Sequence, residues 1–511
     1  MSASLTLTVG AMRMKKDKYR RVVKGVIFFV LLFAAIGLTS RVLEYKVSGK
    51  RIEPFLKDAK SYDVVFLGNS HAIYGVYPLE LWRDYGIASY NLSSFGSTMA
   101  VNYWTARLMI ESAQPKLVVI DVDEISRADK APKSNGDLHI ALDAYPLTPT
   151  KISAIEDLMN NSEEINSDGN RYVDIRWEYY FKLMKYHDRF GELTADDFFP
   201  SREILRGAMM MIDVADPVDY DIIDERQAWD QGGWGYEYLR MLIELCQSRG
   251  IDVLLTHVPF PASEQSQEEA NAVRYMLGEY GIQMIDMVNI DGIADYHVDS
   301  YDQVSHLNPS GARKVTDFLG EYIVGHYDIP DHRGEAEYAV WDADYDAYRN
   351  DKLDILREED DLKVLLMLLH DSDFSVMISL KSGSAVYQEE KLLTLLQNIG
   401  REHIFYEDAY YAWSSAMQPL VQLPRAAAYG VPCFILVDRK GGQIQERAGI
   451  GEDTIQTGFG DVTYRSGEEG ASVLLNGECI LEAQADAQDI RIAVVDDRTG
   501  EVAFVRGFNL E

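Results

Sequence analysis

The chain has 511 residues, of which 47% are hydrophobic, and its 82 acidic against 49 basic side chains give a formal net charge of -33. This length exceeds one ordinary hydrophobic core and predicts two or three domains. The acidic surplus argues against a nucleic-acid partner, because no basic excess is present to displace counterions from phosphates.

The N-terminus contrasts with this acidity. Residues 12–24, MRMKKDKYRRVVK, are strongly basic, and residues 25–40, GVIFFVLLFAAIGLTS, carry no charge. The uncharged stretch is a little shorter than the roughly 20 residues of a full span, and snorkelling of Lys24 and Arg41 makes up the difference. We therefore expect a cytoplasmic segment at 1–24, a single-pass membrane anchor at 25–40 and an extracytoplasmic remainder, since basic flanks stay in the cytoplasm.

A cleaved signal peptide is the alternative to this anchor. The sequence Ala35-Ile36-Gly37 has the small-x-small pattern at which such peptides are cut. In either case a short polar stem, residues 41–60, precedes the first folded domain.

Continuous apolar runs follow the stem, and they are typical of parallel strands that are covered on both faces. They occupy residues 63–68, 116–123, 251–260 and, more weakly, 281–287. Between them, residues 99–113 and 234–250 have apolar side chains at helical spacing. This alternation predicts an α/β domain with a parallel sheet.

A long polar and aromatic insertion, residues 124–233, interrupts the series and contains a helical-looking stretch at 176–193. Large insertions in α/β domains usually lie over the carboxyl edge of the sheet, where ligands bind. A cap without chemistry is the alternative interpretation.

The C-terminal part has a different pattern. Residues 327–362 are charged and unpatterned, which favours a linker, and residues 363–511 then form a separate, mostly β domain. This domain is expected to contain a strand at 374–380, a helix at 388–400, and hairpins at 431–448, 472–481 and 490–508. Its sequence shows no serine, histidine and carboxylate cluster that suggests chemistry.

One short stretch suggests a nucleophile. In VVFLGNSHAIYG, residues 64–75, an apolar run stops before Asn69, Ser70 and His71. Most serines at strand ends are turn residues or caps, so Ser70 needs a base and an acid elsewhere in the chain. The candidates are His306, just before a predicted helix, and Asp302, four residues earlier.

Read together, three stretches resemble the SGNH (GDSL-like) hydrolases, in particular the membrane-anchored branch that includes the alginate O-acetylation proteins and the D-alanyl transfer protein of teichoic acids. GNSHAIYG is similar to the first block, with the nucleophile at Ser70, and YNLSSFG is similar to the second, whose oxyanion-hole glycine is Gly96. DQVSHLNPSGA is similar to the last block, with the base at His306. The resemblance implies a three-layer α/β/α domain over residues 61–326.

The chain departs from the family pattern in two ways. The family's acid usually stands three residues before the histidine, so Asp299 stays open as an alternative to Asp302. No clear third-block asparagine is present, and Asn91 is the expected substitute in the oxyanion hole. The backbone amides of Ser70 and Gly96 are its firmest predicted donors.

Weaker candidates surround this site. His71 is expected to pack or to contact substrate, and residues 185–198 resemble a stretch of related anchored proteins, which makes His187 and Arg189 candidate lid contacts. A second set stands at strand ends and has side chains of the kinds that bind metals: Asp121, Asp123 and His257. Such aspartates are more often caps, and we expect neither a metal nor a cofactor.

The tail, residues 457–508, resembles the domain of interleukin-like EMT inducer proteins, a compact β-sandwich related to a carbohydrate-binding stem domain. The best points of similarity are ASVLLNG, IRIAVVDDRTGEV and the closing GF. The resemblance implies a sugar-binding accessory role at most, and a structural spacer is the alternative.

These resemblances imply an extracytoplasmic, membrane-tethered serine esterase or O-acyltransferase. It would act through an acyl-serine on acyl esters, acetyl being the expected group, of cell-envelope or secreted polysaccharide, in company with an envelope polysaccharide-modification machinery. Whether water or a sugar hydroxyl accepts the acyl group stays open. A non-catalytic polysaccharide-binding or assembly factor on a degenerate SGNH fold is the alternative, supported by the spacing of Asp302.

Overall fold

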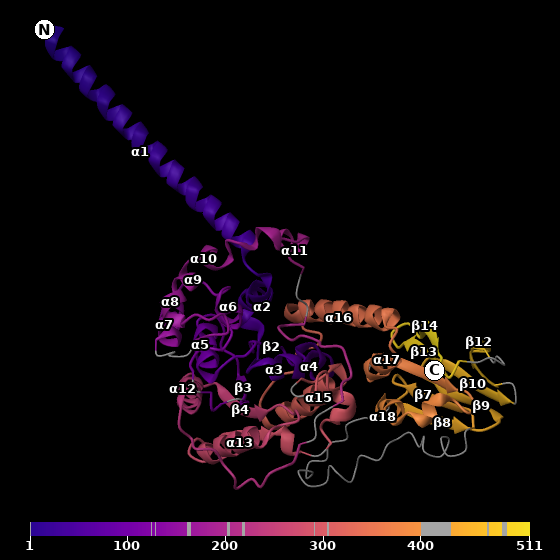
Figure 1. Ribbon diagram of the computed structural model, residues 1–511. Coiled ribbons are helices and arrows are strands. Elements are labelled where there is room, and N and C mark those ends of the chain that lie inside the picture. The colour runs from indigo at the N-terminus through magenta and orange to yellow at the C-terminus, as the bar shows by residue number, and fades with distance from the viewer. Residues whose placement is uncertain are drawn as a thin grey trace.

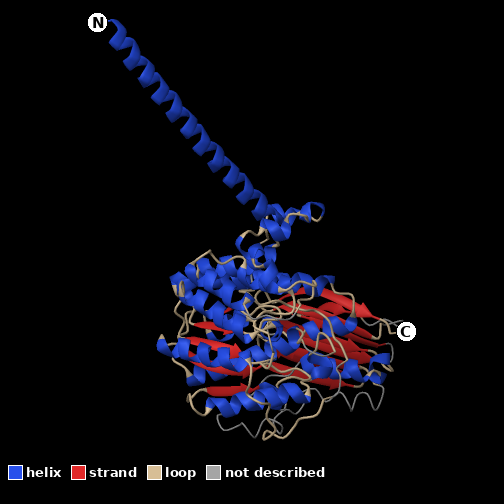
Figure 2. Cartoon of the chain, turned by 60° about the vertical axis from the view of Figure 1, so that its left-hand side comes forward, coloured by secondary structure: helices blue, strands red, loops and turns tan. Residues whose placement is uncertain are grey.

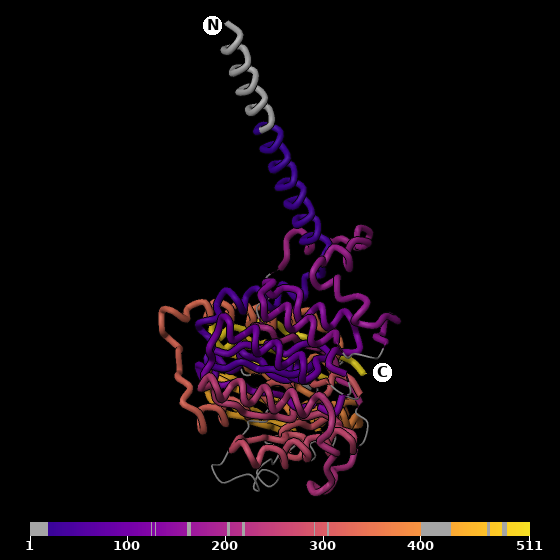
Figure 3. Tube along the Cα trace, turned by 90° about the vertical axis from the view of Figure 1, so that its left-hand side faces the viewer, coloured from indigo at the N-terminus to yellow at the C-terminus, as the bar shows by residue number. Residues whose placement is uncertain are grey.

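The computed structural model describes residues 2–510, residues 2–18 by their backbone alone. The gaps are 124, 128, 161–164, 202–204, 217–219, 291, 304–305, 372, 400–430, 468–469 and 483–487. The first helix, α1 (Ser2–Leu43), leaves the body as a long rod (Figures 1 and 3). Its part Tyr19–Leu43 is long and apolar enough to cross a membrane, and it contains the predicted anchor. A signal sequence near the N-terminus would have the same composition.

A five-stranded parallel sheet forms the centre of the first domain. Its strands are β1 (Val64–Leu67), β2 (Ser89–Asn91), β3 (Leu117–Asp121), β4 (Asp252–His257) and β5 (Gln283–Asp286), in the order β2-β1-β3-β4-β5. The predicted parallel sheet is confirmed, and four of these strands lie inside the predicted runs. Strand β2 was not predicted, because three residues reading SYN carry no apolar run.

Helices cover both faces of this sheet (Figure 2). Val65 and Leu67 belong to the core beneath α5 (Met99–Ile110), α12 (Trp234–Ser248) and α13 (Glu264–Leu277). Val64 and Phe66 belong to the core beneath α4 (Pro78–Tyr85) and α15 (Pro309–His326). Both sides of the central strands β1 and β3 are therefore buried, which explains why these strands are continuous apolar runs rather than alternating ones.

The insertion after β3 forms mostly short helices. They are α6 (Asn135–Leu142), α7 (Pro149–Met159), α8 (Tyr172–Ile175), α9 (Trp177–Tyr180), α10 (Leu183–Tyr186), η2 (Arg189–Gly191) and α11 (Ala195–Phe198). The helical-looking stretch 176–193 is thus broken into single turns. Helices α6 and α7 pack on α5, whereas α10 and α11 contact α1. Much of the insertion therefore lies between the α5 side of the domain and the end of α1, while its first residues lie at the carboxyl edge of the sheet.

The C-terminal part contains two packed antiparallel sheets. One has the order β14-β13-β6-β7-β8 and the other β12-β11-β10-β9. The strands are β6 (Phe374–Leu380), β7 (Cys433–Asp438), β8 (Gln443–Ala448), β9 (Gly451–Thr457), β10 (Gly460–Gly467), β11 (Gly470–Leu475), β12 (Glu478–Leu481), β13 (Ile490–Asp496) and β14 (Glu501–Phe508). The mostly β character and the three predicted hairpins are confirmed.

A hydrophobic core that includes Phe434, Val473 and Ala493 fills the space between these two sheets. The other face of the larger sheet packs against α17 (Leu362–Leu368) and α18 (Glu390–Ile399). Helix α18 matches the helix predicted at 388–400, whose final glycine lies outside the described residues. The other short elements are α2 (Lys46–Lys57), η1 (Ala59–Ser61), α3 (Ser70–Gly75), η3 (Met287–Asn289), α14 (Tyr296–Asp299), η4 (Ala336–Tyr338) and η5 (Ala385–Gln388).

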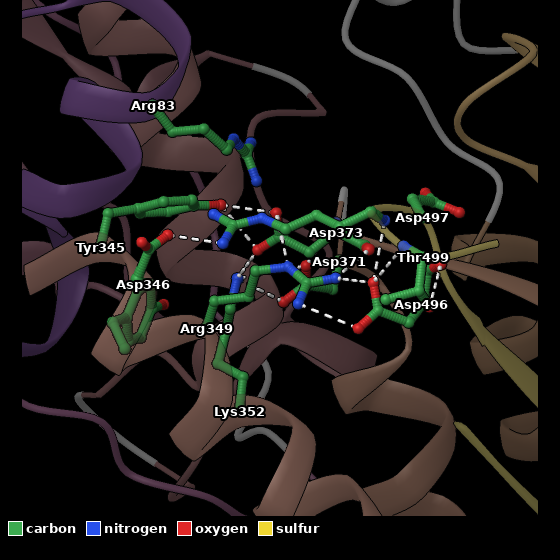
Figure 4. Close-up of polar contacts among 12 residues, drawn as sticks. Arg83, Tyr345, Asp346, Arg349, Lys352, Asp371, Asp373, Asp496, Asp497 and Thr499 are labelled. Atoms are coloured by element: carbon green, nitrogen blue, oxygen red, sulfur yellow. Dashed lines mark hydrogen bonds and ion pairs between the residues drawn. The ribbon is translucent and has the colours of Figure 1, made fainter. Parts of the chain in front are cut away.

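The segment expected as an unpatterned linker contains α16 (Ala339–Glu358), which joins the two domains. Its Trp341 packs in the core of the first domain and its Leu356 in that of the second. Its two buried cations are paired: Lys352 Nζ lies 2.9 Å from Asp371 and Arg349 lies 2.5 Å from Asp496 (Figure 4). This helix was not predicted, because the partners of its buried charged residues are distant in the sequence.

Candidate active site

The nucleophile candidate stands where β1 turns into α3. Gly68 ends the strand in a tight space, since a Cβ there would lie 2.8 Å from Asp121 Cβ and 3.0 Å from Ala72 Cβ. Asn69 caps the helix, its side chain accepting a hydrogen bond from His71 N at 2.9 Å. This strand–turn–helix places a half-buried Ser70 at the carboxyl edge of the sheet.

Ser70 is linked to a histidine and a carboxylate from the loop before α15. His306 Nε2 lies 2.9 Å from Ser70 Oγ, and His306 Nδ1 lies 2.6 Å from Asp302 Oδ2. The other Asp302 oxygen accepts a hydrogen bond from His306 N at 3.1 Å, which fixes the carboxylate against the imidazole. The fold thus brings the three predicted triad residues together in the hydroxyl–imidazole–carboxylate order of an activated serine.

The alternative acid, Asp299, is engaged elsewhere. It is fully buried, and its oxygens lie 2.9 and 2.7 Å from Lys314 Nζ on α15. It also accepts a hydrogen bond from Ser310 Oγ at 2.7 Å. Since the carboxylate on the imidazole belongs to Asp302, the geometry assigns the acid position to the residue four before the histidine.

Aromatic rings from α3 hold the imidazole of His306. His71 and Tyr74 meet it edge to face, with ring centroids 5.6 and 5.0 Å away. His71 itself lies against Phe260 at 4.3 Å, with Nδ1 3.4 Å from Asp123 Oδ2. These contacts agree with the predicted packing role of His71, which also lines the cavity beside Ser70.

Of the predicted oxyanion residues, Gly96 lines the same cavity as Ser70, but Asn91 does not take part. Gly96 has φ +53°, which favours glycine, and a Cβ there would lie 2.9 Å from Asp137 Oδ2. Asn91 is completely buried, and its amide donates to the carbonyls of Ala72 at 2.7 Å and Val76 at 3.2 Å. Because both amide hydrogens hold α3 in place, this placement does not support Asn91 as an oxyanion donor.

The predicted lid contacts also lie elsewhere. Arg189 is buried at the end of α1, where it donates to the Leu43 carbonyl and pairs with Asp197. His187 is exposed and contacts the Met184 carbonyl at 3.0 Å. Neither residue lines the cavity around Ser70, so their predicted substrate-binding role is not supported by this placement.

A second polar chain runs from the cavity wall beneath the sheet edge; Asp123 and His257 were recognised at strand ends in the sequence, but Ser266 and Asp286, which link and extend them, were not. Asp123 accepts from Asn69 Nδ2 at 2.8 Å and from Ser266 Oγ at 3.2 Å. Ser266 Oγ lies 3.4 Å from His257 Nε2, and His257 Nδ1 lies 3.0 Å from Asp286. A polar residue at the end of a parallel strand is the signal that could have found it, since β3, β4 and β5 end there.

The pKa values of His257, Asp121 and Asp123 depend on burial and on nearby charges. Burial alone would lower the pKa of His257, but the Asp286 carboxylate raises it overall. Burial, reinforced by the charge of Asp123, raises the pKa of Asp121 to about 7. Burial works in the same direction on Asp123, yet His71, His257 and hydrogen bonds lower its pKa overall.

The three side chains considered as metal ligands have other partners. Asp121 accepts a hydrogen bond from Val258 N at 2.9 Å, while Asp123 and His257 belong to the polar chain. Within the described ranges, no group of three or more His, Cys, Asp or Glu side chains is arranged to hold a metal ion.

The cavity over Ser70 has a volume of about 730 Å³ and is lined mostly by polar and charged residues. Its hydrogen-bonding side chains come from the segment after β3 and from the start of α13: Asp123, Ser126, Arg127, Asp129, Lys133, Ser263, Gln265, Ser266 and Glu269. Comparison with family models finds no match for the chain, and comparison with curated proteins finds none either. The fold and this geometry therefore carry the functional interpretation.

Proposed function

We propose that the protein is an SGNH-type serine esterase or O-acyltransferase that acts on acyl esters of a cell-envelope or secreted polysaccharide. The observation that carries this proposal is the continuous chain from Ser70 Oγ through His306 to Asp302 at the edge of a polar cavity. An imidazole held by a carboxylate takes a hydroxyl proton readily, so this chain of contacts can activate Ser70 as a nucleophile.

In the proposed reaction, Ser70 Oγ attacks the ester carbonyl carbon while His306 Nε2 takes the serine proton. Asp302 holds the imidazole and stabilises the imidazolium. The backbone amides of Ser70 and Gly96 are the proposed donors to the oxyanion. When the tetrahedral intermediate collapses, His306 returns the proton to the leaving sugar oxygen and the acyl group stays on Ser70.

The second half of the reaction repeats these steps with a new nucleophile. Water or a sugar hydroxyl gives its proton to His306 and attacks the acyl-serine, which regenerates Ser70. Water gives an esterase and a sugar hydroxyl gives a transferase. Side chains such as Arg127 and Gln265 offer the hydrogen bonds that a carbohydrate needs, which supports a glycan as substrate.

The membrane enters the proposal through α1. An apolar helix of this kind would keep the enzyme at the bilayer, and the basic residues before it favour an extracytoplasmic catalytic domain. Substrate would then be a polymer within reach of the membrane surface.

Labelling by a fluorophosphonate tests the nucleophile directly. The full chain should label, whereas Ser70→Ala and His306→Ala should not. Ser266→Ala is the matched control, because Ser266 lies in the same cavity and also contacts a histidine, and it should label like the wild type. Acetate release from an aryl acetate, with and without added oligosaccharide acceptors, then separates hydrolysis from transfer. A folded wild type that neither labels nor releases acetate would overturn the proposal in favour of a binding protein.

A further inference from the structure

The junction between α1 and the body lies within the insertion. Figure 1 shows α10 and α11 on either side of the point where α1 reaches the body, and both helices contact α1. We use the name collar for residues 177–199, which run from α9 to the end of α11. The collar therefore surrounds the last turn of the helix that is apolar enough to cross a membrane.

Several polar contacts fix the collar to residues 44–46, which directly follow α1. Lys182 Nζ lies 2.5 Å from Glu44, and the Arg189 guanidinium stacks over the Tyr45 ring at 3.9 Å. Asp197 on α11 pairs with Lys46 at 3.4 Å. These contacts join the collar to the segment directly after α1 at several points, so we expect the height of the collar relative to α1 to vary little.

The collar also presents large apolar side chains to its surroundings. They are Trp177, Phe181, Met184, Phe190, Phe198 and Phe199, each more than half exposed, with Phe199 at 83%. Water-exposed phenylalanines in such number are unusual for the surface of one short segment. The same residue types are enriched where membrane proteins meet the interfacial layer of a bilayer.

We propose that the collar lies in the interfacial layer of the bilayer that α1 crosses, where its aromatic side chains insert and hold the domain at a fixed height above the lipid. Continuity with α1 identifies the lipid as the occupant, since these side chains begin at the level where the apolar helix ends. This inference rests on α1 spanning a membrane and not on the chemistry of Ser70.

The charge of the collar indicates how it would bind. Its sequence contains Lys182, Lys185 and Arg189 against five acidic residues, and the Lys182 and Arg189 cations are paired with carboxylates. Anionic lipid therefore gains no attraction from this surface. Contact should depend on aromatic insertion, so it should occur with zwitterionic lipid and resist salt.

Depth-dependent quenching tests the collar on the full chain. Phe199→Cys is labelled with an environment-sensitive fluorophore in phosphatidylcholine nanodiscs that hold one copy, in a Cys479→Ser background because Cys479 is the exposed cysteine. Nitroxides attached near the lipid headgroups should quench this label several-fold more than a label at Ile450→Cys, which is also largely exposed but lies in the C-terminal domain. Phe33→Cys, on α1, reports insertion of the helix by acyl-chain nitroxides.

The outcomes are distinct. The proposal is overturned if the label at position 33 is quenched while the labels at 199 and 450 are quenched equally and weakly. It is also overturned if quenching at 199 appears only when the discs hold two copies, because the collar would then be a contact between copies. A second variant sharpens the result. The double change Phe198→Ser and Phe199→Ser should reduce the quenching of a label at Phe190→Cys by at least half. In the protein that keeps Phe198 and Phe199, 1 M salt should leave the quenching of this label unchanged. Loss of quenching in salt would show that charge rather than aromatic insertion holds the collar.

Discussion

The two domains each contain a five-stranded sheet, but only one of them gathers chemistry at a sheet edge. All strands of the first sheet are parallel, so the polar residues that follow them, such as Ser70, Asp123 and His257, meet at one edge. Strands of the second sheet alternate in direction, and strand ends there point both ways. The difference shows how topology, rather than composition, concentrates reactive side chains.

The largest expected effect distinguishes Asp302 from Asp299, two aspartates that lie three residues apart. Asp302→Asn should lower kcat for ester cleavage by about 10³ to 10⁴-fold, because the imidazole loses the carboxylate that orients it. Stability should change little, since the Asp302 side chain is 31% exposed. Asp299→Asn should instead cost about 3–5 kcal/mol of unfolding free energy by removing the buried carboxylate that pairs with Lys314. Ester kinetics and urea unfolding of both variants measure this, and a reversed pattern would identify Asp299 as the acid.

The contact between the domains should come next. Lys352 is buried among Glu80, Asp371 and Asp373, with which it forms ion pairs (Figure 4 labels three of the four). Lys352→Met should cost about 3–5 kcal/mol, because three carboxylates would stay buried without this cation. Calorimetry should show the two domains unfolding in separate transitions.

A surface lysine provides the control for this contact. Lys363→Met removes an exposed cation from α17 near the same domain boundary, and its unfolding profile should match the wild type. Equal behaviour of the two variants would contradict a structural role for the buried cluster.

A smaller effect concerns pH and again belongs to the parallel sheet. The folded-state pKa of Asp121 is about 7, above its ordinary 3.8, so the folded protein binds this proton more tightly than the unfolded chain. Its contribution to stability therefore falls as pH rises from about 4 to 7 and is constant above that range. Between pH 5 and 8 the wild type should lose about 2–3 kcal/mol relative to Asp121→Asn, since the loss covers roughly two pKa units and each unit corresponds to about 1.4 kcal/mol. Unfolding titrations at both pH values test this, and parallel losses in the two proteins would contradict the raised pKa.

How much of this structure the sequence predicts depends on how local the signal is. Strands with continuous apolar runs, hairpins with Asn-Gly or Gly-Gly turns, and the Ser70 turn all carry their signal within a few residues. Ser70 and His306 were predicted as partners because the two motifs that contain them could be interpreted together. Each of these signals survives without knowledge of the tertiary structure.

The failed predictions share the opposite property. Asn91 and Arg189 looked like site residues, but their partners, Ala72 and Leu43, are decided by packing between distant segments. The choice between Asp302 and Asp299 also needed the position of Lys314 on α15. Helix α16 was not predicted for the same reason, since its buried Arg349 is neutralised by Asp496 of the C-terminal domain.

The smallest expected effect tests a local signal in the second domain. Asn476 and Gly477 both have positive φ, +52° and +84°, as the predicted Asn-Gly hairpin between β11 and β12 requires. Gly477→Ala should cost about 1 kcal/mol of unfolding free energy, because a Cβ strains this backbone conformation. Gly467→Ala, at a glycine in β10 without positive φ and with open space around it, should be close to neutral. Fluorophosphonate labelling of Ser70 should be unchanged in both, since this turn belongs to the four-stranded sheet of the C-terminal domain, far in sequence from the carboxyl edge of the parallel sheet. A loss of labelling in Gly477→Ala would mean that the two domains communicate through α16 and that the edge of the parallel sheet does not act independently of the C-terminal domain.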